Sequence, residues 1–438
     1  MKNKNLKKVY VAISADILHH GHINILKIAS TYGEVTVGLL TDSAISSYKS
    51  IPLIDYQNRK NIIESISYVD NVIEQNSYDY SYNLNKLKPD YVVHGDDWKT
   101  GTQSKMRQKV ILTLKKWGGK LIEPKYTGNI SSSKLIDNIS KLGTTPTLRI
   151  NRLNRLLNTK DLIRVMQVHD GLSAMIVEQT SLNKNNKKIE FDAMWDSSLT
   201  SSTSRGKPDI EVVDISSRIS GLNDIIEVTT KPIIFDCDTG GLSEHFAYTV
   251  RSLERLGVGA IIIEDKEGLK KNSLLGANAK QTQADPKNFA KKILTGKKSQ
   301  VTDELMIIAR VESLILNKTV QDAIDRTQIY LDSGADGIMI HSKQKNPNEI
   351  LKFCEKYHKK GFDKPIVVVP TTYDTIKEKD LINAGVKIVI YANHMLRAAY
   401  KPMKQVSLDI LKYQRAHEAS KKHCISISEI LSLIPGTR

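Results

Sequence analysis

Cysteine is scarce in this sequence of 438 residues, which contains Cys237, Cys354 and Cys424 at wide spacings. An odd number of scattered cysteines excludes a disulfide framework and a cysteine-rich zinc site. Long hydrophobic runs are also missing: no stretch of about 18 uncharged apolar residues occurs, so a membrane-spanning helix is not predicted. The first residues, MKNKNLKKVYVAIS, lead into a strand pattern without a small-residue cleavage site, and we expect a cytoplasmic protein.

Acidic residues are fewer than basic ones: 48 Asp and Glu stand against 64 Lys and Arg, which gives a formal net charge of +16. Such a surplus fits nucleic acid, a membrane surface or small anionic substrates as partners. The lysines are scattered among asparagines along the whole chain, and RGG, RRM and finger signatures are absent. A compositional bias explains the surplus most simply, and we expect neither a nucleic-acid nor a membrane partner.

The length predicts two or three domains. Residues 1–137 alternate strand and helix patterns, which is typical of a Rossmann-like parallel sheet wound with helices. Residues 138–153 contain a Gly and a Thr/Pro cluster without a strand, and we expect them to form a linker. Residues 154–438 are predicted to form a second α/β domain with C-terminal helices.

Eight apolar runs follow from Leu162 onward: LIRVMQV, FDAMW, PIIFD, GAIIIE, LMIIARV, GIMIH, PIVVVP and KIVIYA. Seven end in or next to a polar residue: Ser197, Asp236, Glu264, Arg310, His341, Thr371 and Asn393. Eight βα units with reactive side chains at one end indicate a (β/α)₈ barrel, whose active site lies at the C-terminal ends of the strands. The predicted fold class is therefore α/β, with a Rossmann-like domain followed by a TIM-type barrel.

Two of these runs end in clustered carboxylates. PIIFDCD places Asp236 and Asp238 at one strand end, and GAIIIED places Glu264 and Asp265 at the next. A hard cation such as Mg²⁺ prefers oxygen ligands that converge from a rigid scaffold, so this edge of the barrel predicts a magnesium site. Structural ion pairs are the alternative for single acids, but Asp236, Asp238 and Glu264 together, at adjacent strand ends, favour a metal.

The first domain has one sharp motif, His19, His20, Gly21 and His22, directly after the first strand pattern and at the start of a helix. Backbone donors at a helix N-terminus, with two imidazoles one turn apart, form a receptor for polyphosphate oxygens. The alternative is that one or both histidines cap the helix or pack in the core.

Four further strings follow this motif: DYQNRK with Arg59, YVDNVI, HGDDW and YTGNISSSKLI. In this order they resemble the cytidylyltransferase family that activates glycerol 3-phosphate, choline phosphate and ethanolamine phosphate, over nearly all of residues 7–136. The resemblance implies that CTP is bound and that His19, His22, Lys49 and Arg59 act on its phosphates. It assigns nucleotide binding to Ser14, Asp16, His19, His22, Asp96, Trp98, Thr127, Ser131, Ser132 and Ser133.

This chain departs from the family's pattern at two places. These departures bear on the identity of the CMP acceptor and on the turnover rate rather than on the fold. The family usually has an arginine in a string like RTxGIST, where this chain has Tyr126 and Asn129. Near the start, ISAD (13–16) stands in place of Gly-Thr-Phe-Asp. Lys125 is a candidate substitute for the missing arginine, but a lysine does not reproduce a bidentate phosphate contact.

In the second domain, EDKEGLKKNS resembles the EDKxxxKxNS signature of phosphoenolpyruvate mutase. Supporting strings agree in order and spacing across roughly residues 160–410: AMWDSSLT, GKPDIEV, DCDTGG, ARVES, MIHSK and YANHMLRA. The resemblance implies the isomerisation of phosphoenolpyruvate to phosphonopyruvate. It implies Mg²⁺ as cofactor, held directly by Asp236 and through waters by Asp238 and Glu264, with Asp209 as a further candidate.

The remaining site residues follow from the same resemblance. The enolate that forms between departure and return of the phosphoryl group needs positive charge on its oxygens, which Mg²⁺ supplies. The expected catalytic residues are Asp209, Lys270, Asn272 and Arg310, and the expected substrate-binding residues are Trp195, Ser197, Ser198, Leu199, Asn272, Ser273, Arg310 and His341. The stretch KEGLKKNSLLGANAK has the Gly and short polar residues of a lid.

The sequence leaves three alternative functions to consider, two for the second domain and one for the first. A carbon–carbon lyase of the isocitrate lyase type needs a proton donor, usually the Cys of a KKCGH string, and Asn272 cannot serve as that acid. A phosphonopyruvate hydrolase shares most of the site and stays open. The N-terminal domain is alternatively a catalytically weak module that binds a nucleotide and regulates the mutase.

The order of the domains resembles the bifunctional enzyme of fosfomycin biosynthesis and relatives in other phosphonate pathways. We therefore hypothesise an enzyme of phosphonate, antibiotic-type biosynthesis that makes phosphonopyruvate. Its N-terminal half would transfer CMP from CTP to a small phosphonate such as 2-hydroxyethylphosphonate, releasing pyrophosphate. The resemblance also implies a homodimer or homotetramer built through the barrel, with a helix exchanged between neighbours.

Overall fold

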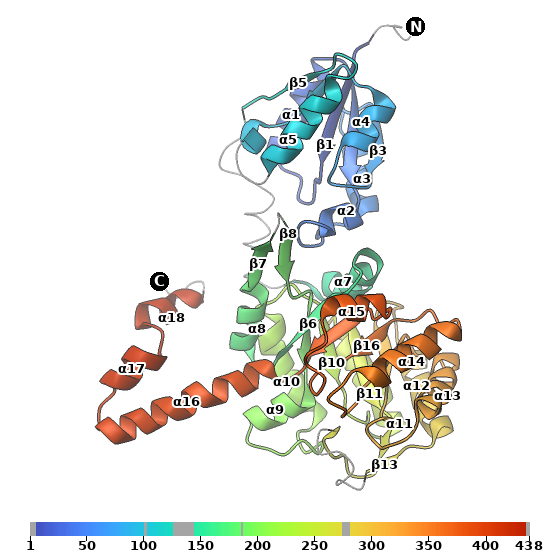
Figure 1. Cartoon of the computed structure of the whole chain (residues 1–438), viewed down its shortest axis with the longest axis vertical. Coiled ribbons are helices and arrows are strands. Elements are labelled where there is room, and N and C mark those ends of the chain that lie inside the picture. Colours follow the sequence, from blue (N-terminus) through green and yellow to red (C-terminus); the bar gives the residue numbers. More distant parts are fainter. Residues whose placement is uncertain (1–5, 100–102, 126–143, 185–186, 274–280, 435–438) are drawn as a thin grey trace. The chain divides into compact units, whose positions relative to one another are not determined.

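The computed structural model describes residues 6–99, 103–125, 144–184, 187–273 and 281–434, and it divides into two compact units (Figure 1). The first unit comprises Met1–Ile139, Asn158–Lys160 and Ser181–Glu190. The second comprises Ser140–Leu157, Asp161–Thr180 and Phe191–Arg438. Each unit is described by itself below.

The first unit contains a parallel five-stranded sheet in the order β3-β2-β1-β4-β5. Its strands are β1 (Lys8–Ile13), β2 (Glu34–Leu40), β3 (Asn71–Gln75), β4 (Tyr91–Val93) and β5 (Lys120–Ile122). Its helices are α1 (His20–Ser30), α2 (Asp42–Ser46), α3 (Tyr56–Glu64), α4 (Ser81–Leu87), the 3₁₀ turn η1 (Asp96–Lys99) and α5 (Ser104–Leu114). The strand order reverses between β1 and β4, and ligands of such sheets bind beyond the carboxyl ends of the strands at that point. The predicted Rossmann-like fold is confirmed.

The second unit contains a closed barrel of eight parallel strands, in the order β10-β11-β14-β15-β16-β17-β6-β9. The strands are β6 (Ile163–Val168), β9 (Ala193–Asp196), β10 (Ile233–Asp236), β11 (Ala260–Glu264), β14 (Met306–Val311), β15 (Gly337–Ile340), β16 (Ile366–Val368) and β17 (Ile388–Tyr391). Each lies in one of the eight predicted apolar runs, because strands of a parallel barrel are covered on both faces and contain few polar residues. The predicted (β/α)₈ barrel is confirmed.

Helices follow the barrel strands: α8 (Gly171–Gln179), α9 (Ser198–Ser204), α10 (Ile215–Ile226), α11 (Ser243–Arg255), α12 (Pro286–Ser299), α13 (Val320–Asp332), α14 (Asn348–Lys359), α15 (Glu378–Asn383) and α16 (His394–Tyr413). The chain then forms α17 (His417–His423) and α18 (Ile427–Leu433), which extend with α16 away from the barrel (Figure 1). Two further pairs of strands are antiparallel: β7 (Ser181–Lys184) with β8 (Lys187–Glu190), which belong to the first unit, and β12 (Lys266–Glu267) with β13 (Thr282–Gln283), which belong to the second. Among the described helices, none is long and apolar enough to cross a membrane.

The stretch expected as a linker, residues 138–153, overlaps helix α7 (Pro146–Thr159). Leu153 and Leu156 on this helix are buried, and Arg149 donates to the carbonyl of Leu256 at 2.7 Å. A helix with a buried apolar side and anchoring hydrogen bonds is part of a packed structure rather than a free connection. Residues 138–143 lie outside the described residues, and the position of the domain boundary stays a prediction.

Candidate functional site

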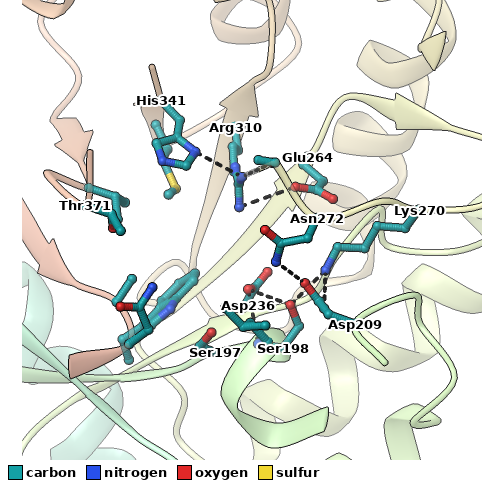
Figure 2. A pocket seen from close by; sticks show the side chains of 17 residues that line it. Ser197, Ser198, Asp209, Asp236, Glu264, Lys270, Asn272, Arg310, His341 and Thr371 are labelled. Carbon is teal, nitrogen blue, oxygen red and sulfur yellow. Dashed lines mark hydrogen bonds and ion pairs between the residues drawn. The ribbon is translucent and has the colours of Figure 1, made fainter. Parts of the chain in front are cut away.

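A pocket lies at the C-terminal ends of the barrel strands (Figure 2). It is lined by Trp195, Ser197, Ser198, Leu199, Asp209, Asp236, Glu264, Lys270, Asn272, Ser273, Arg310, Met339, His341, Val369, Thr371, Ala392 and Asn393. The structure thus brings every predicted substrate-binding residue to one pocket, together with two of the three predicted metal ligands. Since a barrel directs all eight strand ends to the same face, residues far apart in sequence meet here.

Asp236 is the last residue of β10, and its carboxylate accepts hydrogen bonds from Ser198. Its Oδ2 atom lies 3.2 Å from the Ser198 backbone nitrogen and 2.9 Å from the Ser198 hydroxyl. Burial by itself would raise the pKa of Asp236, but the positive charges of Lys270 and Arg218 outweigh it and lower that pKa. Asp236 therefore carries a negative charge inside a buried pocket.

Lys270 connects the acidic residues on this side of the pocket (Figure 2). Its ammonium lies 2.8 Å from Asp209 Oδ1 and 2.8 Å from the Ser198 hydroxyl, and it also bonds to Asp238. Asp238 pairs in addition with Arg218 at 3.3 Å and is not among the pocket-lining residues. Of the predicted metal ligands, Asp236 and Glu264 reach the pocket, and Asp238 lies beside it in ion pairs.

The fit of Mg²⁺ to these carboxylates can be tested on Glu264. Its Oε1 atom is buried and has no hydrogen-bond partner within the described part of the chain, although its Oε2 atom pairs with Arg310 and Lys266 at 3.3 Å each. A buried, unpartnered carboxylate oxygen is costly unless a ligand satisfies it. Among the described residues, no three His, Cys, Asp or Glu side chains converge in a ready-made cation site. Hard oxygen donors from Asp236 and Glu264 nevertheless fit a Mg²⁺ ion that is also bound by substrate and water.

Arg310 and His341 lie next to each other in the pocket (Figure 2). Arg310 Nη2 lies 3.3 Å from His341 Nδ1, while His341 Nε2 is buried without a partner in the described ranges. Burial, together with the charge of Arg310, lowers the pKa of His341 to about 3, so its imidazole is neutral. Because Arg310 can only donate, Nδ1 must accept, and the ring proton then resides on Nε2. His341 therefore offers one N–H donor to an anion in the pocket.

The side chains of Asn272 and Ser273 make different hydrogen bonds. The Asn272 amide donates to Asp209 Oδ2 at 2.6 Å. The Ser273 hydroxyl accepts from Lys266 and Arg310 at 2.6 Å each and donates to Glu312 at 2.7 Å. One donor and two acceptor sites are all that a hydroxyl has, so Ser273 has no hydrogen bond left for substrate in this arrangement.

Several residues in or next to the pocket were not assigned from the sequence. Thr371 and Asn393 follow strands β16 and β17 and line the pocket, and their position after apolar runs was the available signal. Lys266 and Glu312 are buried beneath the pocket and pair with each other at 3.2 Å. Nothing in the sequence pattern links these two residues, because their contact depends on the barrel bringing β11 beside β14.

In the first unit, the histidines of the motif lie at the start of α1. His19 Nδ1 accepts from the Gly21 backbone nitrogen at 3.2 Å, and His22 Nδ1 accepts from the His19 backbone nitrogen at 3.3 Å. Their rings lie 4.1 Å apart between centroids. With both Nδ1 atoms accepting, the neutral rings carry their protons on Nε2 and can donate to phosphate oxygens. Both the predicted receptor and the capping alternative are thus compatible with the same geometry.

Lys49 lies near the end of the first strand, whereas Asp16 and Arg59 are buried. Lys49 Nζ lies 3.4 Å from the Ser14 hydroxyl. Asp16 Oδ1 accepts from the backbone nitrogens of Leu53 and Ile54 at 2.7 and 3.1 Å. These two bonds fix the loop before α3 against the carboxyl end of β1.

Arg59 is fully buried, and its guanidinium is used within the protein. It donates to the carbonyl oxygens of Ser14, Leu40 and Ile54 and to the Asp42 carboxylate. Four of its five N–H donors are therefore occupied. One N–H donor is left in this arrangement of the described residues, and the expected contact of Arg59 with the phosphates of CTP stays a prediction.

Trp98 and Asp96 were both expected to bind the nucleotide. Trp98 is 1% exposed, its ring stacks on His94 with centroids 3.8 Å apart, and its indole N–H donates to Glu123 at 2.8 Å. It can therefore form the wall of a base pocket but not stack freely on a base. Asp96 lies 3.9 Å from Lys99. The structure describes Lys125 but not the residues that follow it. Predicted site residues that lie outside the described residues are Tyr126, Thr127, Asn129, Ser131, Ser132 and Ser133. Residues 274–280 of the expected lid also lie outside them.

His22 gives a testable pH dependence. Burial, together with the nearby His19 and Lys49, lowers the pKa of His22 to about 4. Between pH 6.5 and 4 the unfolded chain binds a proton at this residue that the folded chain does not, so its contribution to stability is complete above 6.5 and is lost as the pH falls. An NMR titration of the imidazole should therefore give a value well below 6, and His22→Gln should reduce the loss of thermal stability between pH 7 and 5. A measured pKa of 6.5 or higher would show that the ring is not buried in this way.

The comparisons with known proteins cover both units. The family model described as phosphoenolpyruvate phosphomutase matches residues 153–411, and the one described as cytidylyltransferase-like matches residues 14–138. A phosphoenolpyruvate phosphomutase of Tetrahymena pyriformis is 32% identical over 274 residues, which are 62% of this chain and 87% of that protein. A phosphonopyruvate hydrolase of Variovorax sp. is 34% identical over 256 residues, which are 58% of this chain and 84% of that protein.

Solved structures give the same result for the second unit. The phosphoenolpyruvate phosphomutase from Streptomyces platensis subsp. rosaceus superimposes with a TM-score of 0.60 at 32% identity, covering 66% of this chain and 95% of that one. A phosphonopyruvate hydrolase in complex with oxalate and Mg²⁺ gives a TM-score of 0.58 at 31% identity, with the same coverage. The N-terminal domain is accordingly cytidylyltransferase-like, and through its barrel the chain belongs to the phosphoenolpyruvate phosphomutase family.

Proposed function

We propose that the barrel pocket isomerises phosphoenolpyruvate to phosphonopyruvate. The observation that carries this proposal is that one pocket contains the Asp236 and Glu264 carboxylates together with the Arg310 and His341 donors, with Glu264 in contact with Arg310 (Figure 2). A substrate that carries a carboxylate, an enol oxygen and a phosphoryl group needs both a cation site and anion donors. The family membership supports the same reaction.

In the proposed reaction the bond between phosphorus and the enol oxygen breaks, and the methylene carbon of the enolate then bonds to phosphorus. Arg310 and His341 Nε2 would hold the phosphoryl oxygens during this transfer, while the Lys270 ammonium, bonded to Ser198, Asp209 and Asp238, would add positive charge nearby. Asp236 and Glu264 would hold Mg²⁺, which supplies positive charge to the enolate and carboxylate oxygens. Trp195, Ser197, Ser198 and Leu199 would surround the carboxylate end, and the burial of the pocket limits the access of water to the phosphoryl group.

Hydrolysis of phosphonopyruvate is the second candidate, because the hydrolase of Variovorax sp. is 34% identical over the same region. When both reactions start from phosphonopyruvate, they differ in the acceptor of the phosphoryl group, which is the enolate oxygen in the reverse mutase reaction and water in hydrolysis. Their products differ accordingly: phosphoenolpyruvate in the first case, pyruvate and inorganic phosphate in the second.

A phosphorus NMR experiment separates the two candidates. The purified full chain, incubated with phosphonopyruvate and Mg²⁺, should convert the phosphonate signal into the phosphate-ester signal of phosphoenolpyruvate. Appearance of inorganic phosphate with an equal amount of pyruvate would replace the mutase by the hydrolase. A phosphonate signal that does not change would contradict both reactions.

We also propose that the N-terminal domain transfers CMP from CTP to a small phosphonate such as 2-hydroxyethylphosphonate. The support is the pair of imidazole Nε2 donors at the start of α1, with Lys49 close to the same strand end. A phosphonate oxygen would attack the α-phosphorus, and the histidine donors would stabilise the negative charge that develops on the departing pyrophosphate. Calorimetry with CTP, followed by a pyrophosphate-release assay with several phosphonates, distinguishes transfer from binding alone.

Self-association through the barrel unit is part of the same proposal. Helix α16 exposes Tyr400, Met403 and Leu411, which are 64, 68 and 76% accessible to solvent. Large apolar side chains on one projecting helix fit an interface with a second copy of the chain. Sedimentation velocity of the full chain should show a dimer or tetramer, and a monomer at micromolar concentration would contradict this part of the proposal.

A further inference from the structure

Lys266 and Glu312 form a buried pair directly beneath the barrel pocket. Lys266 is 3% exposed and Glu312 is fully buried, and neither belongs to the pocket lining. The Lys266 ammonium lies 3.2 Å from Glu312 and 3.3 Å from Glu264. Burying a lysine and a glutamate carries a desolvation penalty that their mutual attraction only roughly offsets. Such a pair therefore contributes little to the stability of the fold. Its contacts with the pocket residues indicate its role better than its stability does.

Lys266 holds the chain on both sides of Asn272. Its ammonium donates to the carbonyl oxygen of Lys271 at 3.1 Å and to the hydroxyl of Ser273 at 2.6 Å. The backbone that flanks Asn272 is thus anchored at the preceding and at the following residue. The Asn272 side chain can then point at Asp209, to which it donates at 2.6 Å, and into the pocket.

Glu312 holds Arg310 on the other side of the same network. Glu312 Oε1 accepts from Arg310 Nε at 2.5 Å, and its Oε2 accepts from the Ser273 hydroxyl at 2.7 Å. The backbone nitrogen of Glu312 donates to Asp265 at 2.9 Å, which fixes the residue after β14 against the end of β11. Arg310 is consequently oriented by its Nε atom, and its Nη atoms are directed at Ser273, Glu264 and His341.

Ser273 joins the two halves of this network. Its hydroxyl accepts from both Lys266 and Arg310 and donates to Glu312, so that all of its hydrogen-bonding capacity lies inside the protein. A shift of Lys266 would be transmitted through Ser273 to Arg310 and through residues 271 and 273 to Asn272. Displacements of about 1 Å at reacting groups can lower rates by about 100-fold.

We propose that Lys266, Ser273 and Glu312 are positioning residues that fix Asn272 and Arg310 in the orientation required for phosphoryl transfer. This inference rests on the proposed mutase function. It gives Ser273 a role different from the substrate contact expected from the sequence, and it assigns a role to two residues that do not line the pocket.

The test is a double-mutant cycle between Lys266→Met and Asn272→Ala, measured as kcat for conversion of phosphonopyruvate by the full chain with Mg²⁺. Alone, Lys266→Met should lower kcat by about 100-fold. In the Asn272→Ala background the same change should cost less than about tenfold, because residues that act through one another are not additive. A loss below tenfold in the native background, or an undiminished loss in the Asn272→Ala background, would overturn the proposal.

Two further variants distinguish a loss of positioning from a failure to fold. Lys297 lies on α12, is not among the pocket-lining residues, and its ammonium lies 2.8 Å from the Asp336 carboxylate. Lys297→Met should leave kcat within about twofold of the native value. Ser273→Ala removes a single oxygen atom and should lower kcat by about tenfold or more while the melting temperature stays within a few degrees. If Lys266→Met does not fold, a Ser273→Ala enzyme within threefold of native kcat overturns the proposal. A native chain without any turnover would instead contradict the proposed function.

Discussion

Asp236→Ala is expected to lower kcat/KM for phosphonopyruvate by about a thousandfold or more. The change removes a carboxylate proposed to hold Mg²⁺, and the loss of a main electrostatic contribution to a transition state has effects of this size. It also leaves Ser198 without this acceptor and removes one of the negative charges near Lys270, which keeps its pairs with Asp209 and Asp238. Initial rates from phosphorus NMR, at saturating and at limiting substrate, measure the effect on kcat and KM separately.

A matched control is available on the same barrel. Asp224 lies on α10 and is exposed, so Asp224→Ala should leave kcat/KM within about twofold of the native value. Asp236→Ala should also retain CMP transfer at the N-terminal domain, because the two reactions are proposed to use separate sites. An Asp236→Ala enzyme that keeps more than a tenth of the native kcat/KM would remove Asp236 from the mechanism.

His22→Ala is expected to lower the rate of CMP transfer by about a thousandfold. The imidazole is proposed to donate its Nε2 proton to a phosphate oxygen in the transition state, and the loss of one such donor typically costs about 100-fold to a thousandfold. Isomerisation of phosphonopyruvate by the same variant should be unchanged. Pyrophosphate release from CTP, followed with the phosphonate that gives the highest native rate, is the measurement.

The neighbouring histidine supplies the control for this experiment. His20 is the first residue of α1 and is exposed, so His20→Ala changes the same helix end without removing either ring that accepts a backbone N–H. It should retain CMP transfer within about threefold. Equal losses for the two variants would indicate damage to the helix rather than loss of a donor, and unchanged transfer in His22→Ala would remove the His22 imidazole from the proposed mechanism.

The fold could be predicted because the barrel strands are covered on both faces. A run such as GAIIIE has one physical explanation, a buried strand, and the polar residue that follows it marks the strand end. The hairpin of β7 and β8 carries no comparable signal, since its residues are mainly exposed and polar. Helix α7 overlaps the expected linker because a Thr/Pro cluster also suits the first turn of a helix.

The residues of the site could be predicted from strand ends and motifs, but their pairing could not. Asp236 and Glu264 reach the pocket because each ends a barrel strand. Arg59 was expected to meet phosphates, yet it lies in the interior, because the carbonyls of Ser14, Leu40 and Ile54 converge on it after folding. The contact between Lys266 and Glu312 likewise depends on strand register, which no local pattern reports.

The most direct test of the central claim is conversion of phosphonopyruvate by the full chain before and after removal of divalent cations. We expect the phosphoenolpyruvate signal in phosphorus NMR to vanish after exhaustive chelation and to return when Mg²⁺ is added in excess, since the Asp236 and Glu264 carboxylates are proposed to hold this ion. Conversion at the full rate in the chelated sample would contradict the proposed mechanism of the barrel.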